Sequence, residues 1–228
     1  MLVRWQGPAG AAVLLAIPAS LSGTLGLWAY YRGMAVGAMS VVAPIAGVSA
    51  AVPVTVGLAT GDRPSALQIA GIVLALAGVG LASREHQEGG TRVAAGAGLA
   101  LLAAVGFGGY FVPMHYAGDA DFWWASLIFR STSFAVIAIA VVASRSSVRM
   151  RAGDVWFVAA VGVGDTLGNV LFAASSGYGL VSVTSVLASL YPLVTVALAR
   201  LVLRERVDRG QQAGAVATLA GIVLISSG

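Results

Sequence analysis

Long apolar runs separated by short charged stretches dominate the sequence. A bilayer core about 30 Å thick requires roughly 20 apolar residues in helical conformation, and charge-free runs of about this length recur along the chain. The runs lack the alternation of lipid-exposed strands, and lipid cannot satisfy an open backbone, so we expect helices. The pattern predicts eight helices, at about residues 8–31, 36–60, 65–83, 93–117, 121–143, 153–176, 180–203 and 210–227.

Composition supports a membrane location. Hydrophobic residues make up 58% of the 228 residues and charged residues 10%, whereas soluble domains carry about 25% charged residues. The predicted fold class is therefore an all-α polytopic membrane protein. The thirteen basic residues are all arginines and are spread thinly among apolar stretches, a pattern that does not indicate nucleic-acid binding. The chain has no cysteine, which excludes disulfides and thiolate metal sites, and we expect neither a metal nor a cofactor.

The first and last thirds of the chain repeat one another. Matches at offsets of 142 and 143 join Thr24-Leu25-Gly26 to Thr166-Leu167-Gly168, Asp62-Arg63 to Glu205-Arg206, Gln68 to Gln211, Gly71 to Gly214 and Gly78 to Gly221. Equivalent helices are five spans apart and therefore cross the membrane in opposite directions. Such inverted repeats build many transporters, with the substrate site at the repeat interface. We predict a first repeat at residues 1–83 (three helices), a connecting loop at 84–92 and a second repeat at 93–228 (five helices).

The second repeat resembles EamA-type members of the drug/metabolite transporter superfamily. The resemblance rests on residues 179–195, which include Tyr191-Pro192, and on Arg204-Glu205-Arg206, Gln211, Gly214 and Gly221. It implies a ten-helix fold of two inverted five-helix repeats that moves small metabolites or drugs across the cytoplasmic membrane. Measured against that plan, we expect the first repeat of this chain to lack the two leading helices. The use of arginine without lysine suggests a bacterial source.

The orientation of the chain stays open at this point. The resemblance implies that both termini lie in the cytoplasm. The loops predicted on the side of the termini hold two arginines, and the opposite loops hold nine. Because positive charge concentrates on the cytoplasmic side, this count places the termini outside.

Two ionisable residues inside predicted spans are candidates for function. At 1.5 Å of rise per residue, Arg130 lies about 13 Å and Asp165 about 12 Å from the same membrane face, so we predict that they pair. Asn169 lies one turn from Asp165 on the same helix face. One interpretation is a structural ion pair that fixes helix packing. The other is that Asp165 binds a proton or a substrate amine while Arg130 gates that binding.

Further candidates for substrate contact follow from polar and small residues at helical spacing. Trp28 and Tyr31 continue a stripe that includes Ser20 and Thr24. The helix at 180–203 carries Ser185 and Ser189, and the helix at 93–117 carries Tyr110. The prolines inside predicted spans free backbone carbonyls, which is tolerated only beside protein or a water-filled cavity; we therefore assign helix-breaking or gating roles to Pro44, Pro113 and Pro192.

These observations predict a secondary transporter, in the exporter or permease class, that moves small organic solutes. Its expected partners are a small-molecule substrate and the lipid bilayer, with no nucleic acid, and homo-oligomerisation stays open. The alternatives are a truncated remnant without transport activity, or a protein that needs assembly to complete its bundle. A membrane-embedded enzyme is disfavoured because such a site needs several acids or histidines at one depth, and the spans offer one Asp and one His near a membrane face.

Overall fold

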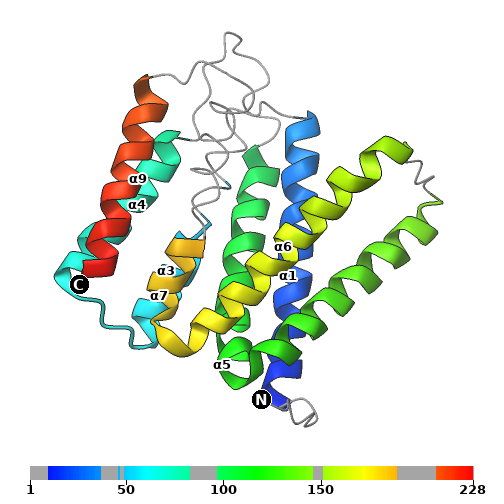
Figure 1. Cartoon of the computed structure of the whole chain (residues 1–228), viewed down its shortest axis with the longest axis horizontal. Helices are drawn as coiled ribbons and strands as arrows, with labels where there is room; N and C mark the ends of the chain where they lie inside the picture. Colours follow the sequence, from blue (N-terminus) through cyan, green and yellow to red (C-terminus); the bar gives the residue numbers. More distant parts are fainter. Residues whose placement is uncertain are drawn as a thin grey trace. The chain divides into compact units, whose positions relative to one another are not determined.

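A computed structural model describes residues 10–36, 46, 49–82, 97–145, 151–188 and 209–227, and the statements below concern those residues. Every regular element in them is helical, which confirms the predicted all-α class. The α-helices are α1 (Gly10–Val36), α3 (Ala51–Thr60), α4 (Ala66–Ala82), α5 (Ala97–Ala143), α6 (Val155–Ser175), α7 (Val181–Ala188) and α9 (Arg209–Ser227), with short 3-10 turns at Ala152–Asp154 and Ser176–Tyr178 (Figure 1).

The described helices have the length and apolar character of membrane spans. Three are long enough to cross a bilayer, at Gly10–Val36, Gly98–Ala143 and Val155–Tyr178, and shorter apolar helices occupy Ala51–Thr60, Ala66–Leu81 and Gln212–Ile225. At 1.5 Å per residue, the 47 residues of α5 extend about 70 Å, more than twice the thickness of a bilayer core. The polytopic prediction is therefore confirmed.

The helix α5 consists of two spans that meet at Asp121. This residue has an extended backbone (φ −168°, ψ 99°) between two helical segments. Its Oδ1 accepts hydrogen bonds from the backbone N–H groups of Trp123 and Trp124, both at 3.1 Å, so Asp121 is the N-cap of the second segment. The sequence predicted a break of three residues here, and the structure makes it with one. Pro113 lies inside the first segment, where the backbone stays helical.

Helix ends agree with the prediction where both ends are described, except in α1. The predicted end at residue 31 was set by the charge of Arg32, but α1 continues to Val36. Arg32 is exposed, and a long arginine side chain can extend to polar surroundings from a helix that continues past it. Within the predicted helix 36–60 the structure describes α3 together with residues 36, 46, 49 and 50, and within the predicted helix 180–203 it describes α7 and residue 180. The other residues of these two ranges lie outside the described residues.

The chain divides into two compact units. The first contains Met1–Leu21 and Pro113–Tyr178, and the second contains Ser22–Val112 and Gly179–Gly228. In the first unit, Gly118 of α5 contacts α6 so closely that an added Cβ would overlap the backbone of Ala173. This close approach explains the buried glycine three residues before the kink at Asp121.

In the second unit, α4 and α9 pack along their whole described length (Figure 1). A Cβ at Gly71 would lie 2.7 Å from the carbonyl oxygen of Gly221, and one at Gly78 would lie 2.7 Å from that of Gly214. The two helices are therefore antiparallel. In the predicted repeat, Gly71 corresponds to Gly214 and Gly78 corresponds to Gly221. Gly71 therefore packs against the counterpart of Gly78, and Gly78 packs against the counterpart of Gly71. This reciprocal contact is expected for helices of an inverted repeat.

Two further groups of contacts lie within the second unit. Gly26 of α1 packs against Gly106 and Phe107 of α5, and the Ser22 hydroxyl donates to the Gly106 carbonyl at 2.9 Å. A second group of buried side chains joins α4, α7 and α9 with Ala50, which precedes α3: Ala50, Ile72, Ala75, Val186 and Ile225. Small residues thus permit close helix contacts here, as in other membrane bundles.

Candidate functional site

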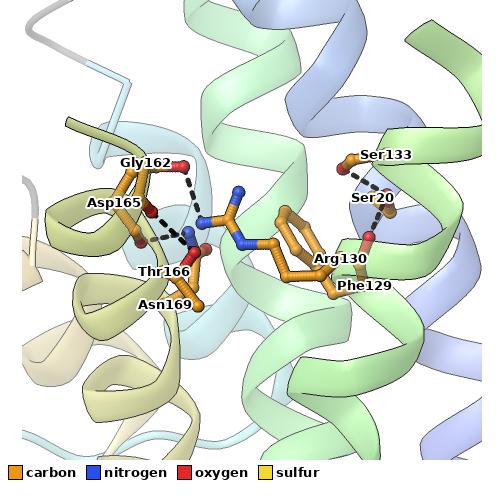
Figure 2. Close-up of polar contacts among 8 residues, drawn as sticks. All are labelled: Ser20, Phe129, Arg130, Ser133, Gly162, Asp165, Thr166 and Asn169. Carbon is orange, nitrogen blue, oxygen red and sulfur yellow. Dashed lines mark hydrogen bonds and ion pairs between the residues drawn. The ribbon is translucent and has the colours of Figure 1, made fainter. Parts of the chain in front are cut away.

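An ion pair joins α5 and α6 within the first unit. Arg130 lies near the middle of the second segment of α5, and Asp165 is the middle residue of α6. Arg130 Nη2 is 2.6 Å from Asp165 Oδ2 (Figure 2), which confirms the predicted pair. Insertion scales assign a single charge at a helix centre a cost of about 2.5–3.5 kcal/mol. Pairing offsets part of this cost for both side chains.

The pair remains accessible and incompletely satisfied. The Asp165 side chain is 62% exposed and that of Arg130 is 30% exposed. The guanidinium of Arg130 lies 5.6 Å from the centre of the Phe129 ring. Its Nη2 atom faces Asp165, whereas its buried Nε atom has no hydrogen-bond acceptor in the described part of the chain. Charge and proximity therefore hold the pair together, and the guanidinium retains capacity to donate hydrogen bonds.

Two further polar side chains of α6 lie next to Asp165 and hydrogen-bond to the backbone of their own helix. The Asn169 side-chain amide donates to the backbone carbonyl of Asp165 at 2.8 Å, and the Thr166 hydroxyl donates to that of Gly162 at 2.7 Å (Figure 2). The first contact holds the amide of Asn169 one turn from the carboxylate, as the helical spacing predicted. A carboxylate, an amide and a guanidinium together can bind a solute that carries both donors and acceptors, or exchange a proton.

A buried hydrogen-bond network fixes the backbone next to Arg130. The Ser20 hydroxyl of α1 is fully buried, donates to the Phe129 carbonyl at 2.8 Å, and lies 2.7 Å from the Ser133 hydroxyl (Figure 2). Because Phe129 precedes Arg130, this contact sets where the arginine leaves α5. Sequence analysis placed Ser20 in a polar stripe but gave it no partner.

Comparison with known proteins assigns the family. A profile of the EamA-like transporter family matches residues 94–227, which is more than half of the chain. The chain belongs to this family. The EamA-like protein is thus an integral membrane transporter of the drug/metabolite superfamily.

This EamA-like chain has the same fold as a protein whose crystal structure has been solved. Its TM-score is 0.74 at 15% sequence identity, and the alignment covers 96% of this chain and 90% of the other. Likeness at this identity concerns the fold alone. No curated protein matches the sequence.

Of the other candidate residues of the EamA-like transporter, Pro113 belongs to the first unit. The rest belong to the second unit or lie outside the described residues. Trp28 and Tyr31 of α1 are exposed, and Tyr110 of α5 is half-buried with its ring 5.0 Å from that of Phe111. Ser185 of α7 is fully buried. Ser189, Pro44 and Pro192 lie outside the described residues. The structure thus brings together Arg130, Asp165 and Asn169 in the first unit.

One contact in the second unit was not predicted. Asp62, which follows α3, accepts hydrogen bonds on Oδ2 from the backbone N–H of Ser182 at 3.0 Å and from its hydroxyl at 2.8 Å. The sequence did carry a signal for it, since Asp62-Arg63 is one of the matches between the repeats. The repeat places an acid at corresponding positions of the two halves, but it does not show which helix Asp62 contacts.

Proposed function

We propose that this protein is a secondary transporter that exports small organic solutes across the cytoplasmic membrane by alternating access. Family membership supports transport. The observation that carries the finer proposal is the pair of Arg130 and Asp165 near the middle of two membrane-spanning segments. Its carboxylate is exposed, and the Nε donor of its guanidinium has no partner in the described part of the chain. A purely structural ion pair between packed helices would be expected to be buried, with its donors satisfied.

In this mechanism the Asp165 carboxylate alternates between Arg130 and a proton or a cationic group of the solute. When the carboxylate is occupied, the guanidinium loses its counter-ion and favours a different packing of α5 against α6. A two-state element of this kind can couple binding to a change in access, because the ligand interacts differently with the two states. Asn169 then supplies a hydrogen-bonding group beside the carboxylate.

Proteoliposomes that contain a pH-sensitive dye test this proposal. The purified protein is exposed to a panel of small amines, amino acids and cationic dyes, with and without an imposed pH gradient. We expect at least one compound to cause protein-dependent proton movement, and Asp165→Asn to abolish it while the variant remains folded and inserted. Asp154→Asn is the matched control, since Asp154 is an exposed acid at the start of the same helix.

Two results would count against the proposal. If Asp165→Asn transports with unchanged pH dependence, coupling through this carboxylate is wrong. If no compound moves and no gradient has an effect while the wild-type protein is correctly folded, the transport proposal itself loses its support, and the interpretation as a remnant without activity gains.

A further inference from the structure

The N-terminus of α7 is capped by a carboxylate from a distant part of the chain. Asp62 and Ser182 are separated by 120 positions, yet a single oxygen of Asp62 accepts both the backbone N–H and the hydroxyl of Ser182. Ser182 is fully buried. Both residues belong to the second unit, in which α3 and α7 are in contact (Figure 1).

This contact replaces a cap that the local sequence does not supply. The first N–H groups of a helix have no partner within the helix, and the residue before the helix usually provides one through a Ser, Thr, Asp or Asn side chain. Leu180 stands at that position before Val181 and has no side-chain acceptor. A carboxylate is also favoured there by the partial positive charge of the helix N-terminus.

The end of α3 has a backbone path that delivers this carboxylate. Gly61 has a φ of +112°, a left-handed conformation that favours glycine. The next N–H, that of Asp62, donates to the Gly57 carbonyl at 2.8 Å. A Cβ at Gly57 would lie 2.5 Å from Asp62 Oδ2 and 2.8 Å from Val181 Cγ1. Two glycines are therefore required for α3, Asp62 and α7 to meet at this point.

The helix that is capped in this way carries Ser185, one turn after Ser182. Ser185 is fully buried, and its hydroxyl has no hydrogen-bond partner in the described part of the chain. A buried hydroxyl without a partner is unfavourable, and its helix must be held in place from elsewhere. The neighbouring Val186 packs with Ile72 of α4 and Ile225 of α9, so displacement of α7 would disturb both helices.

We propose that Asp62 is a positioning residue. Its carboxylate ties the first repeat to the second at the start of α7 and keeps Ser185 buried in its present place. The proposal rests on the proposed function only because it takes Ser185 as a residue that contacts the solute. The hydrogen-bonded contact between Asp62 and Ser182, called the tie below, can be tested without a transport assay.

The test uses the absence of cysteine from the full-length chain. Ser185→Cys introduces a single thiol, whose reaction with N-ethylmaleimide is followed by mass spectrometry on the protein in native membranes. We expect slow labelling of this variant. Adding Asp62→Ala should raise the rate by about tenfold or more, because a hydrogen bond to a charged group shifts a closed–open equilibrium by roughly that factor.

Three comparisons make the result specific. Asp62→Asn should restore most of the protection, because its amide oxygen can still accept both hydrogen bonds. Ser182→Ala should have a smaller effect than Asp62→Ala, because the backbone N–H keeps its acceptor. Asp154→Ala removes an exposed acid elsewhere and should leave the rate unchanged. Equal labelling with and without Asp62→Ala, or an equal rise with Asp154→Ala, would overturn the proposal.

A second measurement covers the case in which Asp62→Ala does not fold. The double variant Asp62→Cys with Ser182→Cys is oxidised in membranes, and its digested peptides are searched for a link between the two positions. We expect an efficient cross-link, and its absence would overturn the tie. If the tie is found but no solute is transported, the proposed function fails on its own; if transport is found without the tie, this inference fails alone.

Discussion

The glycines between α4 and α9 give a quantitative prediction. In Gly78→Ala the new Cβ would lie 2.5 Å from Thr218 Oγ1, 2.6 Å from the Thr218 nitrogen and 2.7 Å from the Gly214 carbonyl oxygen. Two of these atoms belong to the backbone, which cannot rotate away. An ordinary contact with the Thr218 nitrogen, at about 3.4 Å, requires the helices to separate by roughly 0.8 Å. A gap of that size removes a quarter to a half of each dispersion contact that it opens.

The expected magnitude follows from two opposing effects. Overpacking typically costs about 1–3 kcal/mol, and rigid backbone contacts favour the upper end. Alanine is a better helix former than glycine by about 1 kcal/mol, which offsets part of this cost. We therefore expect Gly78→Ala to lower the free energy of unfolding by about 2 kcal/mol, which is roughly a thirtyfold change in the equilibrium constant.

Unfolding of the purified protein in mixed micelles by increasing amounts of sodium dodecyl sulfate, followed by circular dichroism, measures this change. Gly221→Ala should have a similar effect, because Gly221 is the repeat counterpart of Gly78 and meets the backbone of Ala75 at 2.7 Å. Gly98→Ala is the control, since a Cβ there meets nothing within 4 Å. If Gly78→Ala is as stable as the parent while Gly98→Ala is neutral or stabilising, the close packing of α4 on α9 is refuted.

Two further substitutions test contacts that hold helices in place. Ser20→Ala removes a buried hydroxyl that donates to the Phe129 carbonyl, and we expect a loss of about 1 kcal/mol in the same unfolding assay; an unchanged midpoint would show that the contact does not stabilise the fold. Ser65→Ala removes the cap of α4, where the Ser65 hydroxyl and the Gln68 side chain accept from each other's backbone N–H at 3.2 and 2.9 Å. A loss of about 1 kcal/mol is expected, with faster hydrogen exchange confined to the first turn of α4, and uniform exchange along the helix would contradict the capping role.

The sequence predicted the spans and the main ion pair because both follow from the cost of placing polar groups in lipid. Charge-free runs fix where helices cross, and the depths of Arg130 and Asp165 follow from counting residues along two oppositely directed helices. The predicted end of the first helix at residue 31 was wrong, because an arginine near a helix end need not stop the helix. A charged residue shows where a side chain reaches polar surroundings. The helix backbone can continue beyond that residue, as α1 does beyond Arg32.

Contacts between distant segments could be predicted only in part. Asp62 and Gln68 both belong to the predicted repeat, in which they match Glu205 and Gln211. The structure shows that Gln68 caps its own helix, whereas Asp62 caps α7, which lies 120 positions further along the chain. Both side chains accept hydrogen bonds from N–H groups at the start of a helix. The contact of Asp62 depends on how α3 packs against α7, and the spacing of residues in the sequence carries no information about that packing.

The reciprocal pairing of glycines across α4 and α9 has a consequence for how such a protein can be assembled. Since the two glycine contacts, Gly71 with Gly221 and Gly78 with Gly214, correspond under a twofold rotation, this part of the contact needs no covalent connection between its two sides. A polypeptide with one such half could associate with an identical molecule inserted upside down and form the same interface. Joining both halves in one chain then fixes their opposite orientations and allows each half to acquire different side chains elsewhere.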